Sequence, residues 1–305
     1  MRFLTQQLVN GLTLGSVYAL IALGYSMVYG ILKLLNFAHG EVYMVGAFIG
    51  YGVLTVLGGA AAPVLPVPLL LALMFLAAMA GCGLLGVAIE RFAYRPLRDA
   101  PRIAPLISAL GVSFFLQSSA LLLFTARFRS YDTPRLISFE TGVHAGPLHI
   151  SLVRILVIAT AVALMGALSL LVDRTRLGRA MRATAVDREA AAMMGVDVDR
   201  IIVATFFIGS ALAGAGGVMF GLVFSNVYHL MGFSAGLKGF TAAVVGGIGS
   251  IPGAMLGGLL IGLGEAFAAG YISSTFQDLI VFLILIAVML LRPRGLLGAA
   301  QLDKV

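Results

Sequence analysis

Long stretches without a charged residue constrain this chain more than any other feature. The stretches are continuously apolar, whereas the strands of a membrane barrel alternate between apolar and polar residues. A helix needs about 20 apolar residues to cross the hydrocarbon core of a bilayer. The chain is therefore expected to form membrane-spanning helices. The uncharged stretches are Phe3–Leu32, Val42–Ile89, Ile103–Ala126, Ile155–Val172, Ile201–Leu237 and Gly239–Gly264.

Composition and charge agree with a membrane protein. Only 11% of the residues are charged and the mean hydropathy is +1.05, whereas soluble domains carry about 25% charged residues. Ten of the 20 Lys and Arg residues lie in segments 90–102 and 173–200, beside the ends of expected spans. This is the positive-inside pattern, which places both segments in the cytoplasm. The net charge of +7 is therefore a topology signal and does not indicate nucleic-acid binding.

The sequence predicts an all-α, polytopic membrane protein with about eight transmembrane helices in a single transmembrane domain, residues 1–305. The longest apolar stretch must hold two helices, because Gly and Pro interrupt it at 58–68. The expected spans are 8–31, 41–57, 67–89, 103–124, 151–172, 201–223, 253–270 and 275–291.

Two broken or re-entrant segments are expected besides these spans. The arginines at 292–294 place the tail in the cytoplasm, and this requires an extra partial crossing, for which segment 233–247 is suited. Segment 30–42 is polar between two apolar spans. One interrupted segment in each half is typical of transporters built from inverted repeats, so the sequence is compatible with such a repeat.

The cytoplasmic loop 173–200 contains a short predicted helix in "DREAAAMMGVD". Asp187 is a favourable N-cap and Gly195 a favourable C-terminal residue. Ala190, Met193 and Met194 share one face at helical spacing. Such a face suits docking of another protein, because methionine side chains adapt to a partner surface. The alternative is an interfacial helix lying on the bilayer.

Four stretches carry a resemblance to a known family. The loop 175–201 contains Glu189-Ala190-Ala191 followed by Gly195, the E-A-A-x-x-x-G core of cytoplasmic loops in ABC-importer permeases. Together with "GLTLGSVYALIALGYSMVYGI" (11–31), "LNFAHGEVYMVGAF" (35–48) and "GGIGSIPGAMLGG" (246–258), it resembles the branched-chain amino acid permeases of the LivH type. The resemblance extends from about residue 5 to 298.

The resemblance implies a multi-pass permease subunit in the bacterial inner (plasma) membrane. Its partners would be a paralogous permease, two cytoplasmic ATPase subunits and an extracytoplasmic substrate-binding protein. The loop at 178–195 would be the coupling helix that docks on an ATPase. The residues expected to couple the chain to that ATPase are Arg182, Asp187, Glu189, Ala190, Ala191, Met194 and Gly195.

Polar residues in the two broken segments are candidates for the substrate path, since ionisable groups at membrane depth are costly and usually functional. The alternative is that His39 and Glu41 lie in a cytoplasmic turn, with Glu41 favouring the start of the next helix. Glu265 and Asp278, near the ends of the last two spans, are expected to be solvated acids. No metal site is expected. The path candidates are Asn36, His39, Gly40, Glu41, Gly246 and Gly247.

The chain lacks the motifs of an ATPase or another enzyme. Its three lysines, Lys33, Lys238 and Lys304, all fall outside a G-x-x-x-x-G-K-[ST] phosphate-binding loop. We therefore expect a transport subunit that binds no cofactor itself, works by alternating access and relies on ATP used by its partners. The alternative is an ion-coupled secondary transporter of small polar solutes, which would place paired carboxylates deep within its spans.

Overall fold

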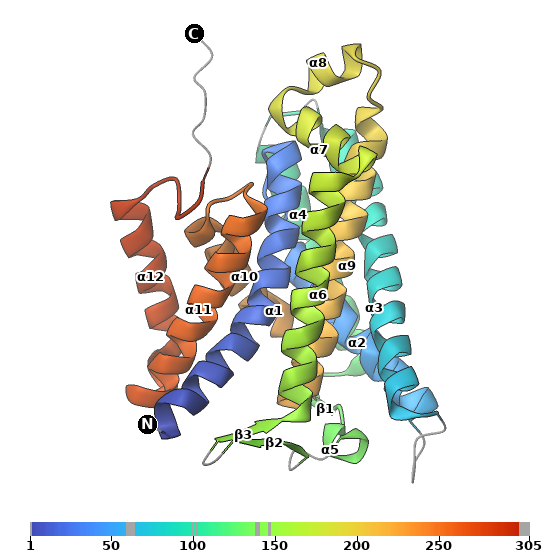
Figure 1. The fold of residues 1–305 in the computed structure, drawn as a ribbon. Coiled ribbons are helices and arrows are strands. Elements are labelled where there is room, and N and C mark those ends of the chain that lie inside the picture. Colours follow the sequence, from blue (N-terminus) through green and yellow to red (C-terminus); the bar gives the residue numbers. More distant parts are fainter. Residues whose placement is uncertain are drawn as a thin grey trace.

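The structure of the protein is a computed structural model that describes residues 2–58, 65–98, 100–101, 103–137, 141–145 and 148–298. Long helices stand side by side, with short strands at one end and a helical loop at the other (Figure 1). The long helices are α1 (Arg2–Leu32), α2 (His39–Leu57), α3 (Val67–Ile89), α4 (Ile103–Phe124), α6 (Leu152–Arg174), α9 (Val198–Phe224), α11 (Ile251–Tyr271) and α12 (Gln277–Leu291).

Shorter elements connect these helices. A π-helical turn η1 (Glu90–Tyr94) and a 3₁₀ turn η2 (Arg95–Leu97) extend α3, and η3 (Ser274–Phe276) precedes α12. The remaining elements are β1 (Arg129–Ser130), α5 (Thr133–Leu136), β2 (Gly142–Ala145), β3 (Leu148–Ser151), α7 (Arg176–Val186), α8 (Arg188–Met193), β4 (Asn226–Val227) and α10 (Met231–Gly246).

The described residues contain eight helices that are long and apolar enough to cross a membrane, which confirms the expected number. The expected partial crossing is also present, as the 16-residue helix α10. At about 1.5 Å per residue this helix is too short to cross the hydrocarbon core alone. The fold is therefore a helical membrane bundle with one additional short helix.

The two ends of the described chain lie at opposite ends of the helical bundle (Figure 1). The amino terminus lies at the end of the bundle that carries β2 and β3, and α8 and the last described residues lie at the opposite end (Figure 1). Because the α7–α8 end carries the basic loops, the positive-inside pattern makes it cytoplasmic. The start of α1 therefore lies on the outer side, and the last described residues lie on the cytoplasmic side.

Burial separates an inner group of helices from an outer one. Residues Ala19–Leu23 of α1 are completely buried, and α1 packs against α9, α10 and α11. By contrast, α4 and α12 expose large apolar side chains, such as Leu122 and Leu290. Apolar side chains on outer helices face lipid, so α1 is a central helix of the bundle.

Two short antiparallel strand pairs join the outer loops. Arg129 of β1 pairs with Val227 of β4, and Gly142 of β2 pairs with Ser151 of β3. The all-α prediction did not include these strands, because segments of two to four residues leave no period that can be recognised in the sequence.

Candidate functional site

The helix α2 begins inside the membrane. The Glu41 Oε1 atom accepts hydrogen bonds from Gln117 Nε2 at 2.9 Å and from Ser113 Oγ at 3.4 Å. Ser113 and Gln117 lie near the middle of α4, which spans 22 residues, so Glu41 lies close to mid-depth. Both His39 and Glu41 are buried. This burial contradicts the alternative that the two residues lie in a cytoplasmic turn, although Glu41 does lie in the first turn of α2 as that alternative expected.

The start of α2 meets the start of α10. A Cβ atom at Gly40 would lie 2.8 Å from the Cα of Gly236 and closer still to the carbonyl oxygen of Gly232. Only glycine fits at position 40 without moving the neighbouring backbone. The two broken segments expected from the sequence thus lie together, and Gly40 is their point of closest approach.

Two buried polar atoms at this junction have no hydrogen-bond partner among the described residues. They are Nε2 of His39 and Oε2 of Glu41. The His39 ring packs edge-on against Tyr25, with ring centroids 4.8 Å apart. Buried polar atoms are normally paired, so each of these two atoms retains the capacity for one further hydrogen bond.

Asn36 shapes the segment that leads into α2. Its Oδ1 accepts the backbone N–H of Ala38 at 3.1 Å and lies 3.3 Å from the Tyr94 hydroxyl oxygen. That hydroxyl also lies 3.1 Å from the carbonyl oxygen of Leu35. The segment is thus held against η1, and the Asn36 side chain stabilises the backbone turn that leads into α2.

Gly246 and Gly247 lie elsewhere. They close the cytoplasmic end of α10, where the C-terminal segment joins them: Leu296 N–H donates to Val245 O and Leu297 N–H to Gly246 O, both at 2.9 Å. The residues of α10 that meet α2 are Gly232 and Gly236. The candidate path residues thus form two groups, and the structure brings together only the four from segment 36–41.

A buried ionic cluster was missed by the sequence analysis. Lys238 Nζ lies 2.7 Å from Glu265 Oε1 and 2.7 Å from Asp278 Oδ1, which joins α10, α11 and α12. The expectation of a solvated Glu265 is wrong, because its side chain is 6% exposed. Asp278, with 60% of its side chain exposed, does lie at the start of α12 as expected. A lone lysine within the apolar segment 233–247 was the available signal, since such a charge needs a partner.

The cytoplasmic loop folds as two helices, α7 and α8. The Asp187 carboxylate caps α8 by accepting the backbone N–H groups of Glu189 at 3.0 Å and Ala190 at 3.1 Å. Gly195 ends the turn with a φ of +85°, a conformation that disfavours other residues. The predicted N-cap and C-terminal glycine of this helix are both confirmed.

The free face of the loop is apolar. Val186, Met193 and Met194 are each more than 80% exposed, at 85%, 82% and 85%, and Ala190 and Glu189 are exposed beside them. Ala191 is buried and faces inward. Five of the seven candidate coupling residues therefore lie on the exposed side of α8 or at its ends, Ala191 packs inward beneath them, and Arg182 lies in α7.

Two arginines attach this loop to the ends of transmembrane helices. Arg182 donates to the carbonyl oxygen of Val172 in α6 and lies 3.6 Å from the Asp173 carboxylate. Arg188 donates from Nη2 and Nε to the carbonyl oxygen of Ile31 in α1, at 2.6 and 3.0 Å. Both contacts satisfy carbonyls that a helix end leaves free.

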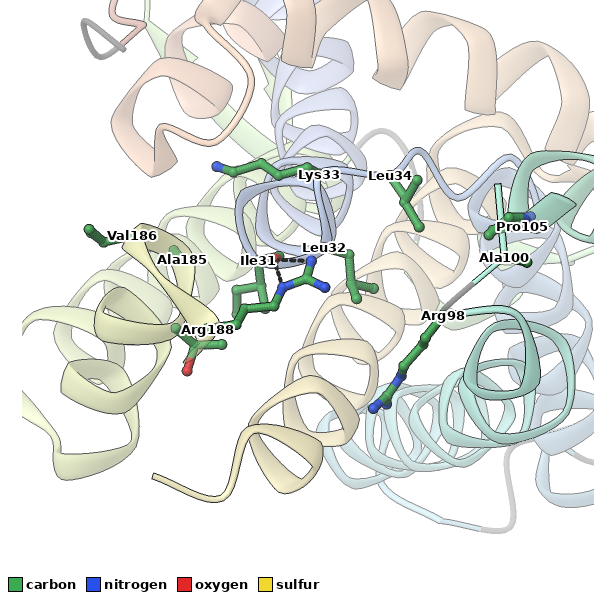
Figure 2. A pocket seen from close by; sticks show the side chains of 11 residues that line it. Ile31, Leu32, Lys33, Leu34, Arg98, Ala100, Pro105, Ala185, Val186 and Arg188 are labelled. Carbon is green, nitrogen blue, oxygen red and sulfur yellow. Dashed lines mark hydrogen bonds between the residues drawn. The ribbon is translucent and has the colours of Figure 1, made fainter. Parts of the chain in front are cut away.

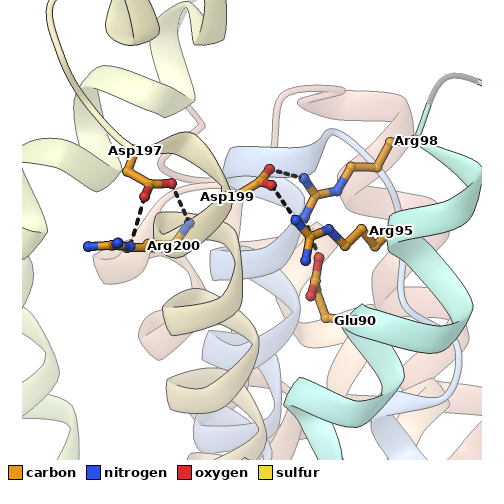
Figure 3. A network of polar contacts seen from close by, with 6 residues as sticks. All are labelled: Glu90, Arg95, Arg98, Asp197, Asp199 and Arg200. Atoms are coloured by element: carbon orange, nitrogen blue, oxygen red, sulfur yellow. Dashed lines mark hydrogen bonds and ion pairs between the residues drawn. The ribbon is translucent and has the colours of Figure 1, made fainter.

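A further ion-pair network ties the start of α9 to the end of α3 (Figure 3). Asp199 pairs with Arg95, with Nη2 and Oδ2 2.8 Å apart, and with Arg98. Arg98 also pairs with the buried carboxylate of Glu90. Because α9 follows the cytoplasmic loop directly, the network fixes where that loop re-enters the membrane.

Comparison with known proteins identifies the family. Residues 7–289 match the family described as the permease component of the branched-chain amino acid transport system. The chain belongs to this family. The permease is 46% identical over 301 residues to the high-affinity branched-chain amino acid transport system permease protein BraD of Pseudomonas aeruginosa, with 98% of this chain and 97% of the relative covered.

Two further relatives span nearly the same length. The permease protein LivH of Escherichia coli K12 is 42% identical over 310 residues, covering 99% of this chain and 98% of its own length. The probable branched-chain amino acid transport permease protein LivH of Methanocaldococcus jannaschii is 26% identical and covers 93% and 89%.

Family membership decides between the functional classes. The permease is an inner-membrane transport component of the ABC-importer type, and the ion-coupled carrier and the enzyme are both disfavoured. Importers of this family work with ATPase and substrate-binding-protein partners.

Proposed function

We propose that this permease imports branched-chain amino acids by alternating access, together with one paralogous permease, two cytoplasmic ATPases and an extracytoplasmic binding protein. The chain itself binds no nucleotide, and ATP is used by the partner subunits. The observation that carries the proposal is the exposed apolar face of α8, formed by Met193 and Met194 and held between a capping aspartate and a left-handed glycine.

The docking step follows from that face. Exposed apolar residues ringed by polar ones mark interaction surfaces, and a helix of this length is too short to be stable alone. Asp187 and Gly195 fix its two ends, so a groove on the ATPase would receive a preformed helix. Glu189 beside the methionines would orient the contact by its charge.

We assign the substrate path to the junction of α2 and α10. Asn36, His39, Gly40 and Glu41 lie on the α2 side of this junction. Opening of the junction would let the unpaired atoms of His39 and Glu41 contact the ammonium or carboxylate of an amino acid. Two polar atoms give weak binding, so substrate selection would rest with the binding protein. Helices that begin at mid-depth are typical of transport paths.

The experiment is purification of the tagged, full-length permease from its native membrane in mild detergent, followed by mass spectrometry. We expect two ATPase chains and a second permease. Gly195→Leu, Glu189→Arg and the double variant Met193→Glu/Met194→Glu should lose the ATPases while still inserting into the membrane. Arg174→Gln, an exposed residue at the same end of the bundle, should retain them.

Two results would contradict the proposal. Recovery of the wild-type chain without ATPases would contradict the proposed importer assembly. Full ATPase retention by all three variants would show that α8 is not the docking helix, without contradicting the importer assembly itself.

A further inference from the structure

One side chain of the coupling helix, that of Arg188, forms hydrogen bonds to the transmembrane helix α1. Arg188 follows the N-cap of α8, and its side chain points away from the exposed methionine face. Its Nη2 and Nε atoms both donate to the Ile31 carbonyl oxygen, at 2.6 and 3.0 Å (Figure 2). Among the described residues, these are the side-chain hydrogen bonds that join α8 to α1.

Ile31 lies in the last turn of α1, where carbonyl groups lack partners within the helix. The helix ends at Leu32, and Lys33 has a φ of +55°, with its N–H donating to Tyr29 O at 2.8 Å. A guanidinium at this place satisfies a free carbonyl and lies favourably at the negative end of the helix dipole. Arg188 therefore holds the end of α1 from the side of the coupling helix.

The contact lies beside a cavity of about 320 Å³. Figure 2 shows the end of α1 and the α7–α8 turn as two of its walls, with Arg98 and Pro105 on the opposite side. The space between the α7–α8 turn and the start of α4 is thus partly open, which leaves room for a movement of α8 relative to α4. The Arg188 link would carry such a displacement to α1.

The end of α1 is continuous with the membrane junction. Segment 33–38 connects it to α2 and is held by the Tyr94 hydroxyl, 3.1 Å from Leu35 O. The Asn36 carbonyl oxygen then accepts the backbone N–H of His39 at 3.0 Å. A shift of the Ile31 carbonyl therefore reaches the start of α2, where His39 and Glu41 lie at mid-depth.

From this geometry we propose that Arg188 is the positioning residue that transmits movement of the coupling helix to α1 and, through segment 33–38, to the α2–α10 junction. The inference rests on the proposed importer function. It separates two roles within the cytoplasmic loop. Met193 and Met194 bind the ATPase, and Arg188, on the inner side, transmits the movement of the bound ATPase to the α2–α10 junction. Loss of Arg188 should thus leave the ATPases bound but disconnected from transport.

The test uses the complete importer, reconstituted in vesicles with its binding protein, and compares Arg188→Met with Arg188→Lys. Three quantities are measured: the amount of ATPase co-purified, the stimulation of ATP hydrolysis by leucine-loaded binding protein, and leucine uptake. For Arg188→Met we expect ATPase retention within twofold of wild type, loss of stimulation, and uptake reduced at least tenfold. Arg188→Lys keeps the charge with a single donating group and should recover part of the uptake.

Arg200→Gln is the matched control, because Arg200 lies at the same end, pairs only with Asp197 among the described residues, and has a side chain that is 87% exposed. Its leucine uptake should equal that of wild type.

Three outcomes are informative. If Arg188→Met binds the ATPases and shows wild-type uptake and wild-type stimulation of ATP hydrolysis, the inference is overturned and the proposed function is unaffected. Loss of the ATPases in Arg188→Met would also overturn it, because Arg188 would then belong to docking. Failure of the wild-type chain to bind ATPases would instead contradict the proposed function.

Discussion

Lys238 Nζ in α10 lies 2.7 Å from Glu265 Oε1 in α11, and this buried ion pair attaches the short helix to a full transmembrane span. Neither side chain is more than 11% exposed. Within a bilayer an unpaired ammonium or carboxylate is strongly unfavourable. The pair therefore fixes the position of α10, and with it Gly232 and Gly236.

Lys238→Met should destabilise the permease by about 3–5 kcal/mol, because it leaves Glu265 buried without its partner. The measurement is the thermal unfolding midpoint in detergent. Asp278→Asn should have a smaller effect, since 60% of the Asp278 side chain is exposed. An unchanged midpoint in Lys238→Met would show that the pair contributes nothing to stability.

Gly40→Ala should impair uptake by at least tenfold. The added methyl group would lie 2.8 Å from the Cα of Gly236, so the α2 and α10 backbones must separate; overpacking of this kind costs about 1–3 kcal/mol. Gly52→Ala is the control on the same helix, because a Cβ at Gly52 meets nothing within 4 Å. Equal leucine uptake by the two variants would argue against a tight junction at Gly40.

Asp187→Ala should weaken α8 by about 1 kcal/mol through loss of its N-cap and reduce ATPase co-purification severalfold. Asp187→Asn retains an oxygen that can accept the Glu189 and Ala190 N–H groups and should remain near wild type. The comparison separates capping from charge. If Asp187→Asn lost the ATPases as fully as Asp187→Ala, the carboxylate charge would be the important property.

Tyr94→Phe should release segment 33–38 from η1, because the hydroxyl lies 3.1 Å from the Leu35 carbonyl oxygen. The expected cost is about 1 kcal/mol, with faster hydrogen–deuterium exchange at residues 35–39 as the measurement. Tyr29→Phe, which removes a hydroxyl near the end of α1, is the control. If hydrogen–deuterium exchange at residues 35–39 is unchanged in Tyr94→Phe, the Tyr94 hydroxyl does not restrain this segment.

The sequence was sufficient for features set by local chemistry. Continuous apolar stretches predicted the eight spans, and the arginine-rich tail required the extra crossing found as α10. Asp187 and Gly195 marked the ends of α8, because capping and a left-handed turn depend on neighbouring residues alone. Each of these features depends on residues that are close together in the sequence, and the same physical rules apply to them in many proteins.

Features that depend on packing between distant residues could not be predicted. Glu265 looked solvated because its position near a span end is visible in sequence, whereas its pairing with Lys238 depends on how α10 packs on α11. Gly246 and Gly247 were grouped with segment 36–41 because both segments are broken, yet Gly232 and Gly236 make the contact. The inward direction of Arg188 likewise follows from the α8–α1 arrangement.

The ion pairs of α10 also bear on the order in which the protein is made. Lys238 leaves the ribosome before either of its partners, Glu265 in α11 and Asp278 in α12. Until those helices are synthesised, insertion of α10 would expose a charged lysine to lipid. We therefore expect α10 to remain accessible to water during biogenesis and to enter the bundle after α12 is complete. In Cys82→Ala chains arrested before residue 274, a cysteine introduced at Ala242, which is buried in α10, should react with an aqueous thiol reagent, and in the full-length chain it should be protected. The short helix would thus be the last part of the membrane domain to take its place.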